Sequence, residues 1–237
     1  MITDAVILAG GLGTRLRSVV ADQPKVLAPV LGRPFITYLL DQVAQAGIRD
    51  VVLCTGYLGE QVQAALGNNY GPLNLVYSQE TELMGTAGAL RLALPLLKTD
   101  PVLVLNGDSY CEADLPAFYH QHQAVKANAS LLLVHLSDTR RYGRVDLDED
   151  GRVLRFEEKG QSTSGWINAG IYLLSRVFLQ AIPTGRVVSL EKEVFPAWLG
   201  RGLYGFSSCL ADSRERFLDI GIPEDYAAAE QFFTHDC

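Results

Sequence analysis

Cysteine and histidine are scarce in this sequence, and their spacing offers no framework for a metal or disulfide site. The 237 residues contain four cysteines and four histidines, and no two cysteines form a CxxC pair. No histidine stands at metal-ligand spacing from a cysteine, which excludes a zinc-binding module. We therefore expect free thiols in a reducing, cytoplasmic compartment at Cys54, Cys111, Cys209 and Cys237.

Long apolar runs and an excess of basic residues are also missing. No run reaches the about 18 apolar residues that a membrane span needs, and the opening ITDAVILAGG lacks the basic leader of a signal peptide. The net charge of −7 argues against sequence-independent binding of nucleic acid, because such binding uses a basic face. An anionic substrate is still compatible, since a local basic pocket can lie in an acidic protein.

The first half of the chain alternates apolar strand patterns with helical patterns. Strands are predicted at 4–9, 50–56, 73–79 and 101–108, and helices at 34–47, 58–67 and 86–97. Apolar runs that are separated by helices indicate a parallel sheet covered on both faces.

After residue 128 the pattern changes to successive strands. They are predicted at 129–136, 143–159, 165–175, 203–208 and 216–220, with a hairpin turn at 148–151 and helices at 189–200 and 223–233. The expected fold class is α/β: a Rossmann-like mixed, mainly parallel sheet with helices on both faces and an added β-hairpin. No linker interrupts the pattern, so we expect one domain over 1–237 with halves 1–127 and 128–237.

A glycine-rich, basic stretch follows the first predicted strand. Gly10, Gly11 and Gly13 would bring bare backbone to the carboxyl edge of the sheet, where ligands bind in open α/β folds. Glycine lets amide groups approach a phosphate closely, and Arg15 and Lys25 add positive charge there. The stretch predicts a cradle for a triphosphate; the alternative is a glycine turn with solvated charges.

Neither of the two commoner phosphate loops is present. The stretch lacks the G-K-[ST] ending of a P-loop, and GGLG does not have the G-x-G-x-x-G spacing of dinucleotide binders. No acidic residue stands where a ribose partner would be expected. The phosphate cradle must therefore be of another kind.

The pattern G-G-x-G-T-R followed by P-K resembles the sugar-1-phosphate nucleotidyltransferase family, which has the nucleotide-diphospho-sugar transferase fold. The resemblance extends over nearly the whole chain. It is carried by LMGTAGALRLA (83–93), LVLNGDSY (103–110), YGRVDLDEDGRVLRFEEK (142–159), INAGIYLL (167–174) and FLDIGIPEDY (217–226).

The resemblance implies roles for individual residues. Catalysis would use Arg15 on the β- and γ-phosphates, Lys25 on the α-phosphate, and Asp108. Gln79 and Gly85 would contact the base edge. The whole set implied to bind the nucleotide is Leu8, Gly10, Gly11, Gly13, Thr14, Arg15, Gln79, Gly85, Thr86 and Asp108. The set implied for the sugar phosphate is Gly143, Glu158, Lys159 and Asn168, with Lys159 on the phosphate.

Two aspartates are expected to hold a metal ion. Asp108 and Asp219 each follow an apolar strand segment, and two carboxylates beside phosphates suit Mg²⁺. Taken singly, each could be a turn or helix-cap residue. Transfer would then need positioning and charge neutralisation rather than a protein nucleophile, because a phosphate monoester is itself a competent nucleophile.

Within the family, motifs such as SLEKEVFP and DIGIPEDY look most like those of the bacterial D-glycero-α-D-manno-heptose 1-phosphate guanylyltransferases. The resemblance implies GTP and that heptose 1-phosphate as substrates, with neither nucleic acid nor a membrane as a partner. Thymidylyl, uridylyl or cytidylyl transfer to a hexose 1-phosphate, and guanylyl transfer to mannose 1-phosphate, stay open, as does a homo-oligomer. A catalytically silent subunit is disfavoured, because Arg15, Lys25 and both aspartates are present.

Overall fold

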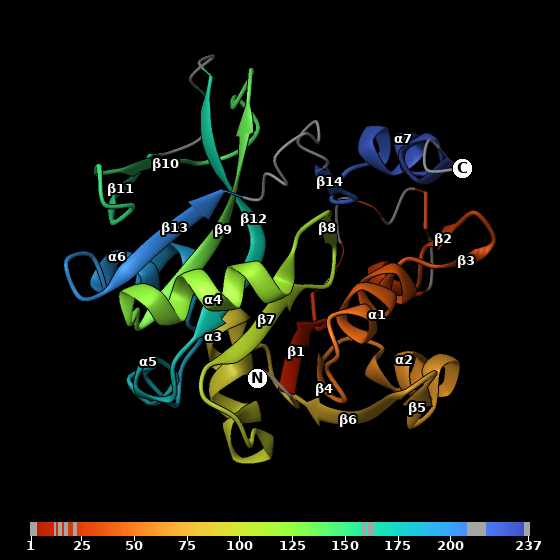
Figure 1. Cartoon of the computed structure of the whole chain (residues 1–237). Helices are drawn as coiled ribbons and strands as arrows, with labels where there is room; N and C mark the ends of the chain where they lie inside the picture. The colour runs from red at the N-terminus through yellow and green to blue at the C-terminus, as the bar shows by residue number, and fades with distance from the viewer. Residues whose placement is uncertain are drawn as a thin grey trace.

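The molecule is built around one mixed β-sheet to which both halves of the chain contribute (Figure 1). The computed structural model describes residues 4–11, 13, 16, 19–20, 23–157, 160, 164–207 and 217–234. The strands run in the order β11-β10-β12-β7-β1-β4-β6-β5, and β9 pairs with both β12 and β13. Its strands are β1 Asp4–Leu8, β4 Asp50–Thr55, β5 Asn69–Tyr70, β6 Leu73–Gln79, β7 Val102–Asn106, β9 Ala129–Leu136, β10 Arg144–Leu147, β11 Val153–Glu157, β12 Gly165–Leu174 and β13 Leu203–Ser207.

Short ribbons and helices complete the fold. Two antiparallel ribbons pair β2 Pro29–Val30 with β3 Arg33–Pro34, and β8 Ser109–Cys111 with β14 Phe217–Asp219. The α-helices are α1 Ile36–Gln45, α2 Gly59–Leu66, α3 Gly85–Ala93, α4 Leu115–Val125, α5 Arg176–Gln180, α6 Phe195–Ala197 and α7 Pro223–Thr234. Single turns of 3-10 or π-helix span Lys25–Leu27, Leu94–Leu96 and Leu190–Val194.

Strands β1, β4, β6 and β7 of the first half are parallel and aligned. In β1, Ile7 lies opposite Leu53 of β4 on one side and Leu105 of β7 on the other. Successive side chains of a strand point to opposite faces, and here both faces are apolar: Ile7 belongs to one hydrophobic cluster and Val6 to the other. The carboxyl ends of these strands therefore meet at one edge.

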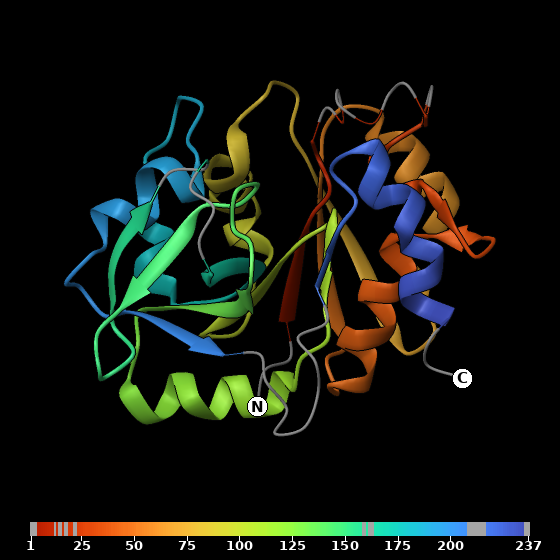
Figure 2. The same ribbon diagram turned by 90° about the horizontal axis from the view of Figure 1, so that it is seen from above.

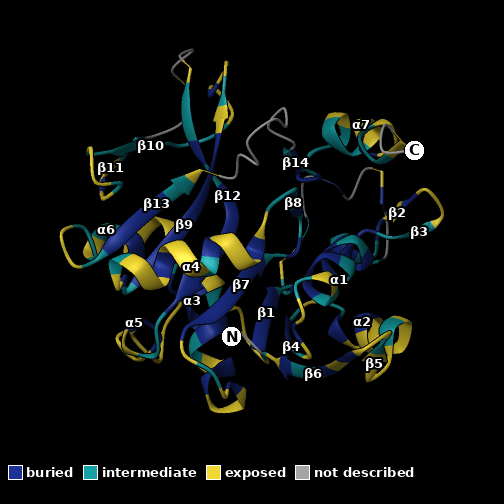
Figure 3. Cartoon of the chain, viewed as in Figure 1, coloured by how far each residue is buried: buried dark blue, intermediate teal, exposed yellow. Residues whose placement is uncertain are grey.

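Helices cover both faces of the sheet, as the sequence predicted. Helices α1, α2, α4 and α7 contribute to the cluster on one face, and α3, α5 and α6 to the cluster on the other. Figure 2 shows α7 lying beside α1, where Tyr38 and Phe233 stack with ring centroids 3.9 Å apart. In Figure 3 the central strands are buried and the outer helix faces exposed.

The second half of the sheet is largely antiparallel. Strand β12 is antiparallel to both β7 and β9, and its register against β9 shifts between Asn168 and Tyr172. The predicted β10–β11 hairpin is present, and its turn is held by Asp148, whose Oδ1 accepts hydrogen bonds from the amides of Asp150 and Arg152.

Two helices differ from the expectation, one in each half of the chain. Helix α4 was not predicted, although Asp114 caps its start by accepting a hydrogen bond from the Ala117 amide at 2.8 Å. The helix expected over 189–200 is present only in part: Ser189 caps it, but a π-helical turn and the short α6 end it at Ala197. Within the described ranges, no helix has the length and apolar character needed to cross a membrane.

Candidate active site

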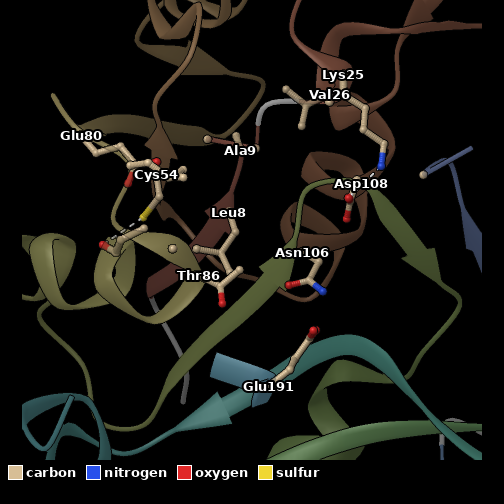
Figure 4. A pocket seen from close by; sticks show the side chains of 17 residues that line it. Leu8, Ala9, Lys25, Val26, Cys54, Glu80, Thr86, Asn106, Asp108 and Glu191 are labelled. Atoms are coloured by element: carbon tan, nitrogen blue, oxygen red, sulfur yellow. Dashed lines mark hydrogen bonds and ion pairs between the residues drawn. The ribbon is translucent and has the colours of Figure 1, made fainter. Parts of the chain in front are cut away.

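A cavity of about 400 Å³ opens at the carboxyl edge of the parallel strands (Figure 4). Residues that end or follow β1, β4, β6 and β7 form much of its lining. These are Leu8, Ala9, Gly10, Gly11, Cys54, Glu80, Asn106 and Asp108. The remaining lining residues are Gly13, Lys25, Val26, Leu83, Gly85, Thr86, Ala89, Glu191 and Gly221.

Glycines allow the strand ends to come this close. The Gly107 amide donates a hydrogen bond to the Leu8 carbonyl at 2.9 Å, and a Cβ at Gly107 would lie 2.6 Å from that oxygen. A Cβ at Gly10 would lie 2.7 Å from Oε1 of Glu80. Gly13 has a φ of +58°, a conformation that favours glycine. The glycine loop therefore lies at the cavity, as the sequence predicted.

The predicted charges Lys25 and Asp108 meet in an ion pair at the cavity. The Lys25 ammonium lies 2.8 Å from Oδ2 of Asp108, and the two side chains are 10% and 45% exposed. Lys25 is thus largely enclosed, while the Asp108 carboxylate also faces the open cavity. A lysine held in this way is a fixed point charge for a phosphate oxygen.

Asp219 reaches the same place by a route that the sequence did not indicate. It lies in β14, opposite Ser109 of β8, and the Ile220 amide donates to the Asp108 carbonyl at 3.0 Å. The two aspartates therefore meet through an antiparallel ribbon outside the main sheet. Burial raises the pKa of Asp219, and the negative charge of Asp108 raises it further, against the opposing effect of Lys25.

The charge balance around the two aspartates suits a bound cation. One lysine stands against two carboxylates, and the pKa of Asp219 is raised first by burial and then by the negative charge of Asp108. In the part of the chain that the structure describes, no cluster of three or more His, Cys, Asp or Glu side chains could hold a metal ion. Among the described residues, the protein would thus offer a cation two carboxylates. This fits an ion that also takes phosphate oxygens and water as ligands.

Glu80 is the cavity residue that sequence reasoning missed. It follows β6, and its Oε2 accepts a hydrogen bond from the Met84 amide at 2.9 Å. Burial raises its pKa. The expected base-contacting residue Gln79 is instead exposed and lies outside the cavity lining. Alternation along the strand turns neighbouring side chains to opposite sides, so a one-residue shift in the assignment would have found Glu80.

The first turn of α3 joins the cavity to the second half of the chain. Gly85 has a φ of +74°, and a Cβ there would lie 2.5 Å from the Val188 carbonyl. The Leu190 amide donates to Oγ1 of Thr86 at 2.8 Å. The predicted residues Gly85 and Thr86 both line the cavity, and this contact brings Glu191 into the lining as well.

The sugar-phosphate residues are placed only in part. Asn168 and Gly143 are described, and neither belongs to the cavity lining. The Asn168 amide donates to the Tyr172 hydroxyl at 2.9 Å and accepts from the Gly170 amide at 3.0 Å. Thr14, Arg15, Glu158 and Lys159 lie outside the described residues.

The thiols at and near the cavity are not reactive groups. Cys54 and Cys111 are buried, and neither forms a disulfide, as predicted for these two. Burial and the charge of Glu80 raise the pKa of Cys54 to about 12, so its thiol stays protonated.

A glycine-lined cavity with a fixed lysine–aspartate pair, at the carboxyl edge of a parallel sheet, is the kind of site at which α/β proteins bind phosphates. The model of the nucleotidyl transferase family matches residues 4–236. The chain belongs to this family, which confirms the resemblance that its motifs indicated.

Relatives are similar over the whole chain. The D-glycero-α-D-manno-heptose 1-phosphate guanylyltransferase of Aneurinibacillus thermoaerophilus is 36% identical over 233 residues, covering 98% of this chain and 99% of that protein. The mannose-1-phosphate guanylyltransferase of Mycobacterium tuberculosis is 39% identical over 228 residues, covering 94% of this chain and 62% of that protein.

The fold is shared with a solved structure. HddC from Yersinia pseudotuberculosis, complexed with GMP-PN, superposes with a TM-score of 0.83 at 32% identity. The match covers 98% of this chain and 100% of that one. The predicted α/β fold class is therefore confirmed.

Proposed function

We propose that this protein transfers a guanylyl group from GTP to D-glycero-α-D-manno-heptose 1-phosphate, giving the GDP-sugar and pyrophosphate. The observation that carries the proposal is the pairing, in one cavity, of a carboxylate for a base with a lysine–aspartate pair for phosphates. In Figure 4, Glu80 lies on one side of the cavity and Lys25 with Asp108 on the other, with Leu8 and Ala9 between them. A nucleotide would span the two.

Glu80 favours guanine over the other bases. An ionised carboxylate only accepts hydrogen bonds. Guanine offers it two adjacent donors, the N1 proton and the N2 amino group. Adenine places an acceptor at N1, and uracil or thymine flank their one N–H with two carbonyls, which a carboxylate repels. Glu80 therefore supports GTP as the nucleotide.

The chemistry is a displacement at the α-phosphorus. A phosphate oxygen of the sugar 1-phosphate forms the new P–O bond, and the bond to the β-phosphate oxygen breaks, releasing pyrophosphate. Lys25 would donate to an α-phosphate oxygen and stabilise the charge that builds up there. Contacts of Arg15 with the leaving phosphates and of Lys159 with the sugar phosphate stay predictions.

Mg²⁺ fits the two carboxylates. Asp108 and Asp219 would hold it, together with phosphate oxygens. When bound, Mg²⁺ neutralises phosphate charge during the displacement. The place of Asp219 supports this assignment, because its carboxylate is buried next to the negative charge of Asp108, with Lys25 as the opposing positive charge.

A second candidate acceptor is mannose 1-phosphate. The 39% identity with the mycobacterial mannose-1-phosphate guanylyltransferase favours it. Both candidates use GTP, so Glu80 does not separate them. The same carboxylate disfavours transfer from dTTP or UTP, and cytosine offers it one donor, the N4 amino group, where guanine offers two. A cytoplasmic location and a homo-oligomer stay predictions.

The test is a matrix of nucleotides against sugar 1-phosphates with Mg²⁺ present. Pyrophosphate release is measured for GTP, ATP, dTTP, UTP and CTP, each with the heptose, mannose and glucose 1-phosphates. We expect GTP with the heptose 1-phosphate to give the highest kcat/KM. Faster use of dTTP with glucose 1-phosphate would contradict the proposal.

A further inference from the structure

Hydrogen bonds centred on the hydroxyl of Tyr172 link the two halves of the chain through Asn106, Asn168 and Glu191. We call these four residues the seam. Tyr172 lies in β12 and is fully buried. Its ring packs on Phe195 with centroids 5.2 Å apart. A tyrosine hydroxyl can donate one hydrogen bond and accept two, so its partners show how the group is oriented.

Two amides occupy its accepting positions. Asn168 donates through Nδ2 at 2.9 Å and Asn106 donates through Nδ2 at 3.4 Å. The amide of Asn168 cannot be reversed without loss, because its Oδ1 accepts from the Gly170 amide at 3.0 Å. The hydroxyl proton is left to point at its third partner, Oε1 of Glu191, at 3.5 Å.

Glu191 is where this network reaches the cavity. Glu191 and Asn106 both line it, and Figure 4 shows the Glu191 side chain extending into the cavity from the side away from Lys25 and Asp108. Burial raises the pKa of Tyr172 well above that of a free tyrosine, so its hydroxyl remains a donor toward Glu191. The Leu190 amide, bonded to Thr86, fixes the backbone just before Glu191.

We propose that the Glu191 carboxylate accepts hydrogen bonds from ring hydroxyls of the sugar 1-phosphate, and that Tyr172 is the positioning residue that holds it there. The proposal rests on the proposed function. A carboxylate repels phosphate but is a strong acceptor for a hydroxyl. Glu80, Lys25 and Asp108, which line the cavity from the first half of the chain, would take the base and the phosphates. Glu191 lines the cavity from the second half, which leaves it for the sugar.

The first test compares E191Q with the matched control E193Q. Glu193 pairs with Arg186 at 2.6 Å, outside the cavity lining, and glutamine keeps its acceptor oxygen for the Ser189 amide. We expect the KM for the heptose 1-phosphate to rise by about 10-fold or more in E191Q, since a hydrogen bond to a charged group is lost. The KM for GTP should stay within about twofold of the wild type, and E193Q should match the wild type.

Deoxy sugars identify the contact directly. The 2-, 3-, 4- and 6-deoxy analogues of mannose 1-phosphate are assayed against both enzymes. With the wild type, we expect one deoxy analogue to lower kcat/KM by about the same factor as the E191Q substitution does with mannose 1-phosphate itself. With E191Q, that analogue should lower kcat/KM little further. If each analogue lowered kcat/KM by the same factor in both enzymes, the proposal would be overturned.

Tyr172→Phe provides the second variant, because it keeps the ring packing and removes only the hydroxyl. We expect its KM for the sugar 1-phosphate to rise several-fold, with the same analogue affected. An unchanged sugar KM in both variants of an active enzyme, or a rise in the KM for GTP alone, would overturn the proposal. If the wild type used no sugar 1-phosphate at all, the proposed function itself would fail.

Discussion

The two halves of the molecule build their share of the site in different ways. In the parallel half, many of the cavity residues end or follow strands: Gly10 follows β1, Glu80 follows β6, and Asp108 follows β7. In the antiparallel half, Tyr172 lies in the middle of a strand and Glu191 in a π-helical turn. The first arrangement places functional residues at the edge of the sheet, while the second places them among packed side chains.

This difference predicts how the halves respond to substitution. Side chains beyond a strand end take little part in the core, so their loss should change chemistry and leave stability nearly intact. Tyr172 is fully buried and bonded to three side chains, so changes around it should alter stability and chemistry together. The predictions below test that separation.

Asp108→Asn should have the largest effect. We expect kcat to fall on the order of 10²-fold or more, because the carboxylate that pairs with Lys25 and would hold the cation is lost. The melting temperature should change little, since the lost ion pair is offset by relief of the repulsion with Asp219. Steady-state kinetics over a range of Mg²⁺ and thermal melts of the same samples measure both. A collapse in stability would mean that this edge is structural.

Glu80→Gln should relax the choice of base. A bidentate contact to a base is worth about 1–3 kcal/mol, or roughly 5- to 150-fold in discrimination. We expect the preference for GTP over ITP, which lacks the N2 amino group, to shrink accordingly. Because burial raises the pKa of Glu80, the wild-type preference for GTP should also weaken as the pH falls toward that raised value.

Gln79→Ala is the matched control for this substitution. Gln79 is exposed and outside the cavity lining, so its removal should leave kcat/KM for GTP unchanged. If Gln79→Ala relaxed the base preference and Glu80→Gln did not, the assignment made from the sequence would be right and Glu80 would be a structural residue that holds the Met84 amide.

The same contrast explains what could be predicted from the sequence. Periodicity and glycine placement predicted the parallel strands, and two of the strand ends pointed to residues that line the cavity, Gly10 and Asp108. The seam could not be predicted, because Tyr172 in an apolar strand has the pattern of a core residue. Glu191 reaches the cavity only through the contact of its segment with Thr86, which no local pattern encodes.

Gly170→Ala should cost stability at the seam. Gly170 has a φ of +79°, and a Cβ there would lie 2.5 Å from Oγ of Ser109 and 2.9 Å from Nδ2 of Asn106. A strained backbone of this kind costs about 1–3 kcal/mol, which chemical denaturation measures. The control is Gly11→Ala in the parallel half, where a Cβ would meet nothing within 4 Å. If both variants lost the same free energy of unfolding, the two halves would not differ in how their site residues contribute to stability.

Asp219→Asn should give the smallest change in stability, and its sign is the informative part. Burial and Asp108 raise the pKa of Asp219 in the folded protein, so its ionisation opposes folding. The penalty is absent below the unfolded-state pKa of about 3.9, grows as the pH rises from there to the raised folded-state pKa, and is fully present above it. Without Mg²⁺, the variant should therefore melt above the wild type at pH 7, by about 2–4 °C for each kcal/mol gained, and the gap should close near pH 4.

Added Mg²⁺ should reverse this order if Asp219 belongs to the cation site. An ion that binds only the folded protein stabilises it, so the wild type should gain in melting temperature and Asp219→Asn should gain less. Asp225→Asn is the control, because Asp225 is already paired with Arg141 and its loss should bring no gain at pH 7. If Asp219→Asn melted below the wild type at neutral pH without Mg²⁺, Asp219 would be a structural acceptor for the Gly221 amide. It would then not be one of two repelling carboxylates that bind a cation.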